Sequence, residues 1–269
     1  MVSTSELISK AAWVRRRTFE MVISAGSGHL GGSFSSTDIL VALYYGGVLK
    51  YDPSNPDWDK RDRFIASKGH SSLALYPILA DLGFFPISDI ESFNDAGSTL
   101  GGHPDTRTPG IETVTGSLGH GLGIGAGLAL GAERNGISAR TYVLIGDGES
   151  QEGAIWESAM FAAQHKLSGL TVIVDNNGVS ATDHTAKTIN VEPIVDKWTA
   201  AGWDSRLVDG HSFDDLLKSF EGVGTSDRPK AIIANTVKGK GVSFMEDTAA
   251  YHHGLPSGDQ IELARMELS

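Results

Sequence analysis

Residues 141–177 of the sequence read TYVLIGDGESQEGAIWESAMFAAQHKLSGLTVIVDNN. The stretch holds two apolar runs, TYVLI and LTVIV, which are separated by an amphipathic helical segment. In a right-handed strand–helix–strand unit both strands run in the same direction. We therefore expect Asp147 and Asn177, which follow the two runs, at the carboxyl edge of one sheet. Open α/β folds bind their ligands at this edge.

The residues at this edge have the chemistry of a metal site. Carboxylate, amide and main-chain carbonyl oxygens suit Mg²⁺ or Ca²⁺, and Mg²⁺ commonly completes its octahedron with phosphate oxygens. The Gly146-Asp147-Gly148 turn lets backbone amides approach a phosphate, and the following helix would point its N-terminus there. Strands also end in Asp, Asn and Gly for turn formation alone. Two such ends with flanking glycines favour a divalent cation that bridges a diphosphate to the protein.

Strands and helices alternate along the rest of the sequence. Strands are expected at 63–67, 141–145, 170–174, 204–208 and 230–236. Further helices are expected at 5–24, 36–45, 71–82, 118–134, 191–201 and 213–220, with a helical turn at 88–93 and a loop-rich tail. The alternation predicts an α/β fold with a doubly wound, mostly parallel sheet and helices on both faces. Without an internal repeat or a composition break, we expect one domain over residues 1–269.

Composition excludes several classes of protein. The formal net charge of −11 leaves no basic surface for nucleic acid, and the absence of cysteine excludes disulfides and thiolate metal sites. No apolar run approaches the roughly 20 residues that span a bilayer, and the N-terminus lacks a signal-peptide core. We therefore expect a cytoplasmic protein with no membrane contact.

Histidines gather in loops beside glycine. Five of the nine histidines stand there, at positions 29, 70, 103, 120 and 253. A lone loop histidine is usually just exposed, but this clustering indicates a glycine-lined cleft. A neutral histidine both donates and accepts hydrogen bonds, so it can bind hydroxyl groups and transfer protons.

GDG followed by DNN about thirty residues later resembles the thiamine diphosphate motif. Six stretches together resemble transketolase, in order along nearly the whole chain. They are SGHLGG (27–32), SKGHSSLALY (67–76), GGHPD (101–105), TGSLGHGLG (115–123), GDGESQEGAIWESAMFAAQHKL (146–167) and KGKGVSFM (238–245).

Transketolase has a diphosphate-binding, a pyrimidine-binding and a C-terminal module, and the resemblance covers only the first. It implies the N-terminal, thiamine diphosphate-binding subunit of a split transketolase. Such an enzyme moves a two-carbon ketol unit from a ketose (phosphate) to an aldose (phosphate). The implied cofactors are thiamine diphosphate and Mg²⁺, with Ca²⁺ or Mn²⁺ as alternatives. Because the acid that activates the cofactor belongs to the pyrimidine module, the resemblance implies activity only with a separate pyrimidine-domain subunit, in an α₂β₂ assembly.

The resemblance also implies roles for individual residues. The metal ligands are Asp147, Asn177 and the backbone carbonyl of Val179. The cofactor-binding residues are His70, Gly116, Leu118, Asp147, Gly148, Glu152, Asn177, Val179 and His253. The catalytic, substrate-facing residues are His29, His70, His103 and His253. His253 is preferred to His252 because it precedes Gly254.

Three positions depart from the family pattern. Leu30 replaces the usual Pro, His120 the common Gln, and Tyr251-His252 a Trp-like approach to the last histidine. We expect them near the substrate channel, which leaves the sugar open. The run 121–127 imitates a dinucleotide-binding fingerprint, but its small residues more readily serve close helix packing, at a dimer interface.

Other functions remain open at this point. Deoxyxylulose-phosphate synthase and the E1 α chain of a 2-oxo acid dehydrogenase use the same cofactor, but QEG after GDG and the GHPD loop favour transketolase. A cofactor-binding module without turnover is the alternative outside enzymes.

Overall fold

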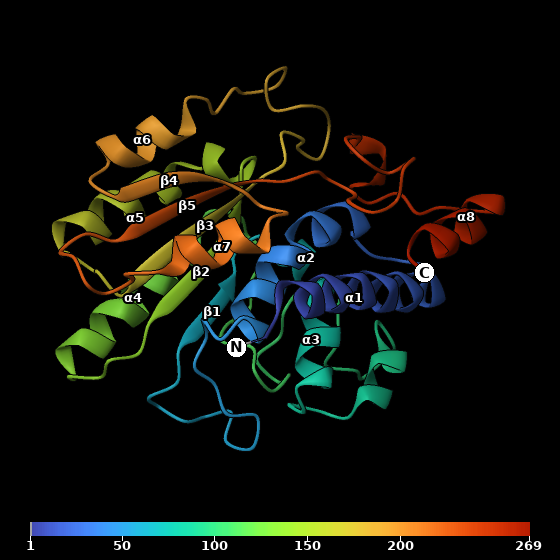
Figure 1. Ribbon diagram of the computed structural model, residues 1–269, viewed down its shortest axis with the longest axis horizontal. Coiled ribbons are helices and arrows are strands. Elements are labelled where there is room, and N and C mark those ends of the chain that lie inside the picture. The colour runs from blue at the N-terminus through green and yellow to red at the C-terminus, as the bar shows by residue number, and fades with distance from the viewer. Residues whose placement is uncertain (1) are drawn as a thin grey trace.

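The computed structural model describes residues 2–269, and its centre is one five-stranded sheet (Figure 1). The strands are β1 (Arg63–Ala66), β2 (Thr141–Gly146), β3 (Leu170–Asn176), β4 (Asp204–Asp209) and β5 (Lys230–Asn235). Their order in the sheet is β1-β2-β3-β5-β4, and every neighbouring pair is parallel. The predicted parallel α/β sheet is confirmed.

Helices precede, connect and follow these strands. The α-helices are α1 (Thr4–Ala25), α2 (Leu30–Tyr45), α3 (Leu75–Asp81), α4 (Gly121–Arg134), α5 (Gly153–Gln164), α6 (Ile194–Ala200), α7 (Phe213–Phe220) and α8 (Asp259–Glu267). Short 3₁₀ helices are η1 (Gly69–Ala74), η2 (Ile87–Ser92), η3 (Glu149–Gln151) and η4 (Ala249–Tyr251). Within the described chain, no helix combines the length and the apolar character needed to cross a membrane.

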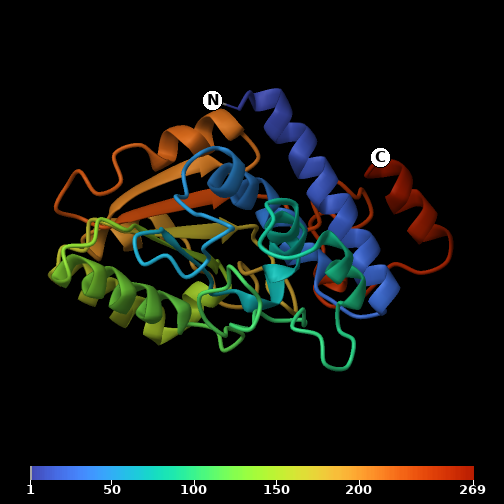
Figure 2. The same cartoon turned by 90° about the horizontal axis from the view of Figure 1, so that it is seen from below.

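The helices cover both faces of the sheet, because successive side chains of a strand point to opposite faces. On β2, Tyr142 and Leu144 belong to the apolar cluster with α1, α2, α3 and α7. Val143 and Ile145 belong to the cluster with α4, α5 and α6. Figure 2 shows the green helix α4 on one side of the sheet and the orange helix α7 on the other. The fold is therefore doubly wound, as predicted.

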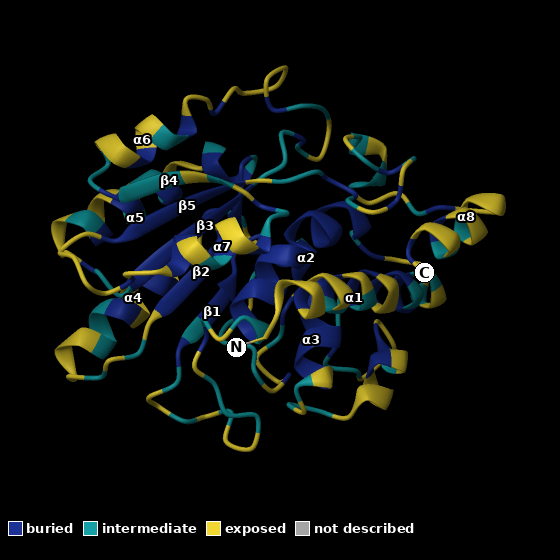
Figure 3. Ribbon diagram, viewed as in Figure 1, coloured by how far each residue is buried: buried dark blue, intermediate teal, exposed yellow. Residues whose placement is uncertain are grey.

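Helix α2 is buried along almost its whole length (Figure 3). Its hydroxyl groups are satisfied locally, because Ser36 donates to the carbonyl of Gly32 at 2.7 Å and Thr37 to that of Ser33 at 2.8 Å. The predicted start at residue 36 was wrong, since the helix begins at Leu30. A Cβ on Gly31 would lie 2.9 Å from the carbonyl oxygen of Tyr251, so glycine permits close packing here rather than a loop.

Other boundaries also differ from the prediction. The helix expected at 71–82 begins as the 3₁₀ helix η1, and α4 begins at Gly121 rather than at Leu118. The tail was predicted to be loop-rich, but it contains α8. This helix lies against α1, where Arg265 forms an ion pair with Glu20 at 2.8 Å and Leu268 joins the apolar cluster of Phe19.

Candidate active site at the carboxyl edge of the sheet

Four strands deliver one side chain each to the same place. Lys68, Asp147, Asn177 and Lys238 follow β1, β2, β3 and β5 by one to three residues, and all four line a single cavity. The cavity has a volume of about 460 Å³. It lies at the carboxyl edge of the sheet, where the sequence predicts a ligand site.

The structure brings most of the predicted site residues together in this cavity. Its wall includes His29, His70, His103, Gly116, Leu118, Asp147, Gly148, Glu152, Asn177 and Val179. His252 also lines the cavity, whereas His253 does not. The ring of His253 still lies 4.6 Å from the ring of His29, between centroids, so both histidines stay close to the predicted site. The role of each residue remains a prediction.

Of the residues that depart from the family pattern, His252 lines the cavity, whereas Leu30, His120 and Tyr251 do not. Leu30 is fully buried in the apolar cluster that also contains Phe19. His120 is exposed, and Tyr251 packs against Phe244. Each stands close to a cavity residue in the sequence, so any influence on the substrate would be indirect.

Asp147 is a buried carboxylate without a cationic partner in direct contact among the described residues. It is 3% exposed, and its two oxygens accept hydrogen bonds from the backbone N–H groups of Gly148 at 2.7 Å and Gly178 at 2.6 Å. Burial, together with the charge of Asp175, raises the pKa of Asp147. A cation at this carboxylate would offset the cost of burying its charge.

Asn177 has a fixed amide orientation. Its Nδ2 donates to Asp175 at 3.2 Å, and its Oδ1 accepts from the backbone N–H of Val179 at 3.1 Å. The amide oxygen therefore points toward the backbone of Val179. The carbonyl of Val179 is another predicted metal ligand. Asp175 decides this orientation because an ionised carboxylate only accepts hydrogen bonds.

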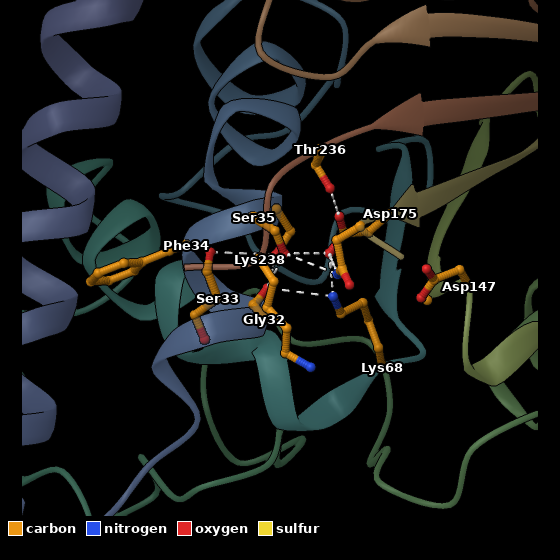
Figure 4. Close-up of polar contacts among 12 residues, drawn as sticks. Gly32, Ser33, Phe34, Ser35, Lys68, Asp147, Asp175, Thr236 and Lys238 are labelled. Atoms are coloured by element: carbon orange, nitrogen blue, oxygen red, sulfur yellow. Dashed lines mark hydrogen bonds and ion pairs between the residues drawn. The ribbon is translucent and has the colours of Figure 1, made fainter. Parts of the chain in front are cut away.

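Asp175 is itself the centre of a buried polar cluster (Figure 4). It accepts hydrogen bonds from Ser35 at 2.6 Å, from Thr236 and from the ammonium group of Lys68. Burial would raise the pKa of Asp175, but the charge of Lys68 and the hydrogen bonds of Lys68, Ser35 and Thr236 together outweigh it, so that the pKa is lowered. Sequence reasoning missed this cluster. A signal was present, because Asp175 and Asn177 are two residues apart at the end of a strand and so share a face.

The sequence-based prediction of the site also missed Lys238. Its ammonium group is buried and donates to the backbone carbonyls of Val179 and Ser180, both at 2.8 Å, and it lies 2.9 Å from Nδ1 of His252. Burial, with the charge of Lys68, lowers the pKa of Lys238 to about 8. Two buried ammonium groups beside two buried carboxylates make the cavity suitable for an anion accompanied by a cation.

A group of histidine rings forms another part of the wall. The ring centroid of His29 lies 5.4 Å from that of His70 and 6.0 Å from that of His103. Burial lowers the pKa of His29 to about 4, of His70 to about 2 and of His252 to about 3. The three rings are therefore neutral at pH 7, able both to donate and to accept. Nδ1 of His29 is buried without a hydrogen-bond partner among the described residues, as expected of an atom that meets a ligand.

The loops around the cavity are held in close contact. Gly116 has φ +144°, and a Cβ there would lie 2.9 Å from Cδ2 of His103. Glu149, which sequence reasoning also missed, accepts from the backbone N–H groups of Gly119 at 2.9 Å and Gly146 at 3.2 Å. The helix expected to start directly after the GDG turn does not do so. The turn continues into η3, and α5 begins only at Gly153.

Comparison with known proteins agrees with this architecture. The family model described as "Transketolase, thiamine diphosphate binding domain" matches residues 8–269. A subunit of the apulose-4-phosphate transketolase of Phocaeicola vulgatus is 42% identical over 269 residues, which cover 100% of this chain and 95% of that protein. The 6-deoxy-6-sulfo-D-fructose transketolase subunit SqwG of a Clostridium species is 41% identical over 250 residues, covering 92% of this chain and 90% of that protein.

The solved transketolase from Campylobacter jejuni superposes with a TM-score of 0.92 at 31% sequence identity. The match covers 100% of this chain but only 43% of that one, so the chain spans less than half of the Campylobacter enzyme. The two short relatives are covered almost completely, whereas the long transketolase is not. The chain belongs to the transketolase family and matches the family's thiamine diphosphate binding domain.

Proposed function

We propose that this chain is the N-terminal subunit of a two-component transketolase, which moves a two-carbon ketol unit from a ketose (phosphate) to an aldose (phosphate). The observation that carries the proposal is the cavity, in which oxygen ligands, two buried ammonium groups and neutral histidines lie together. We also propose that residues 1–269 form one domain and that the protein is cytoplasmic.

The cavity residues fit a metal-bound diphosphate. Asp147, Asn177 and the carbonyl of Val179 form a set of hard oxygen ligands, which suits Mg²⁺, with Ca²⁺ or Mn²⁺ as alternatives. Lys238 and Gly148 line the cavity beside these ligands, and the charge of Lys238 would attract the diphosphate. In this structure the ammonium group donates to Val179 and Ser180, and the Gly148 N–H donates to Asp147. The raised pKa of Asp147 supports this assignment, because a buried carboxylate gains from a neighbouring cation.

Thiamine diphosphate, when bound, supplies the nucleophilic carbon that takes up and releases the two-carbon unit. The histidines of this chain would do the work on the sugar. His29, His103 and either His252 or His253 would bind sugar hydroxyl groups and move protons at their ring nitrogens. His70 would contact the cofactor. The unpartnered Nδ1 of His29 supports a substrate-facing role.

A second polypeptide completes the enzyme in this proposal. The names of the Phocaeicola and Clostridium relatives describe each of them as one subunit of a transketolase, and this chain covers 43% of the Campylobacter transketolase. We propose that a separate pyrimidine-domain subunit supplies the remainder, including the acid that activates the cofactor, in an α₂β₂ assembly. The small residues of α4 would contribute to a subunit interface, since a Cβ at Gly127 or Gly131 would meet open space.

The test is native mass spectrometry of the tagged chain, purified from its own cells, followed by a ketol-transfer assay. The proposal expects a second chain in equal copy number and a mass increment for thiamine diphosphate with its metal. Full ketol transfer by this chain alone would refute the two-component enzyme. Cofactor binding without turnover in the presence of the partner would instead support a non-catalytic module.

A further inference from the structure

A second buried polar cluster lies beside the cavity and has no part in the function proposed so far. Arg15 of α1 pairs with Asp38 of α2 through two hydrogen bonds, at 2.6 and 3.1 Å. His211, in the loop between β4 and α7, places Nδ1 2.6 Å from the same carboxylate. Both charged residues are less than a tenth exposed, so this cluster joins three distant parts of the chain inside the protein.

The hydrogen bonds indicate which ring nitrogen of His211 donates and which accepts. Its Nε2 accepts from the backbone N–H of Val237 at 2.9 Å, so this nitrogen carries no proton. The proton of the neutral ring is then on Nδ1, where it is donated to Asp38. Because Arg15 already balances the charge of Asp38, a neutral ring is sufficient.

The contact with Val237 matters because the next residue is Lys238. Residues 236–239 follow β5, and three hydrogen bonds hold this segment in place. Thr236 donates to Asp175, Gly239 donates its N–H to the carbonyl of Gly31 at 3.0 Å, and the Val237 N–H is held by His211. These contacts fix the backbone from which the side chain of Lys238 reaches Val179 and Ser180 at the cavity wall.

We propose that His211 is a positioning residue for the cofactor cavity. As an acceptor oriented by Asp38 and Arg15, it holds the backbone at Val237 so that the ammonium group of Lys238 stays at the cavity wall. The inference rests on the proposed function, since the charge of Lys238 must attract the diphosphate. Within the described part of the chain, His211 is not among the residues of the cavity wall, so it would act through the backbone of 236–239.

Two variants separate the two hydrogen bonds of the ring. In His211→Gln, the side-chain carbonyl reaches the place of Nε2, so the acceptor for Val237 is kept and the donor to Asp38 is lost. In His211→Asn, the amide nitrogen occupies the place of Nδ1, so the donor is kept and the acceptor is lost. His165→Asn, at an exposed histidine after α5, is the matched control.

The measurements are amide hydrogen exchange of residues 236–239 without cofactor, and calorimetric affinity for thiamine diphosphate with Mg²⁺, both on the full chain with its copurified partner. We expect His211→Asn to exchange faster at Val237 and to bind about tenfold more weakly, as the loss of one hydrogen bond to a buried N–H would cause. His211→Gln should remain within about threefold of the unchanged protein, since it keeps that bond. Heat unfolding of all variants checks that each is folded.

Equal affinity and equal exchange in the Asn and Gln variants would overturn the inference. Failure of the unchanged protein to bind the cofactor would count against the proposed function instead, while exchange at Val237 would still report on His211. A further test needs no variant. The ¹⁵N chemical shifts of the His211 ring should show a neutral ring with the proton on Nδ1. A proton on Nε2 would refute the assignment.

Discussion

Asp147 and Asp175 are two buried carboxylates at the ends of adjacent strands, yet their surroundings differ. Asp175 accepts hydrogen bonds from several side chains, including the ammonium group of Lys68, and its pKa is lowered. Among the described residues, the side chain of Asp147 accepts hydrogen bonds only from backbone N–H groups, and its pKa is raised. The first carboxylate is compensated within the protein, whereas the second retains the capacity to bind a cation.

Replacing Asp175 should have the largest effect on folding. Asp175→Asn removes the negative charge that compensates Lys68, and the loss of one partner of a buried pair costs about 3–5 kcal/mol. We expect this loss in the free energy of unfolding, measured with urea on the chain without cofactor. A double variant, Lys68→Met with Asp175→Asn, should recover part of the stability. No recovery would mean that the pair is not the reason for the loss.

Replacing Asp147 should instead affect binding. Asp147→Asn removes a charged metal ligand, and we expect affinity for thiamine diphosphate with Mg²⁺ to fall more than about 100-fold, beyond the effect of outer residues around a metal. The free energy of unfolding without cofactor should change far less than in Asp175→Asn. Calorimetric titration and urea unfolding of both variants test the contrast. If both variants lost affinity and stability to a similar extent, the two carboxylates would not have the different roles assigned here.

Replacing Lys238 should have a smaller effect on cofactor binding than replacing Asp147. Lys238→Met keeps the length of the side chain but removes its charge, and we expect about tenfold weaker binding of the cofactor, as for one charge-assisted hydrogen bond. The variant should still fold, because burying the charged ammonium group costs free energy, as its lowered pKa shows, and the variant removes that cost. The exposed Lys166→Met is the control. Unchanged affinity would remove Lys238 from the diphosphate site.

The last prediction concerns pH. The pKa of His29 is about 4 in the folded chain, below the ordinary value of about 6.5 that applies when the chain unfolds. Between these values the unfolded chain binds more protons, so stability is complete above about pH 6.5 and falls as the pH is lowered toward 4. His29→Asn should show a shallower fall than the unchanged protein in urea unfolding across this window. An identical slope would contradict the assigned pKa.

Much of the fold was predictable because local patterns control it. The apolar runs before Asp147 and Asn177, and the helical segment between them, specify one strand–helix–strand unit without reference to the rest of the chain. The true start of α2 at Leu30 was not predictable in this way. Gly31 and Gly32 usually indicate a loop, and only the tertiary packing of Tyr251 and Ser71 against them explains the helix.

The site was predictable where a single residue carries the chemistry. The prediction failed where the interacting residues are distant in sequence. The pair of Lys68 and Asp175 spans 107 positions and depends on the order of the strands. Lys238 follows a strand whose place in the sheet no local pattern gives. Likewise, α8 depends on the pair between Arg265 and Glu20, which lie 245 positions apart.

The strand order has a consequence for how the protein is made. β5 is the last strand of the sheet to leave the ribosome, yet it lies between β3 and β4 rather than at an edge. A nascent chain that ends before residue 230 therefore cannot complete the sheet and lacks Lys238 as well. The pairing of β5 joins residues far apart in sequence, a kind of contact that forms slowly. The sheet is thus incomplete until β5 has paired, and the unfinished sheet is the stage at which a newly made chain needs protection from aggregation.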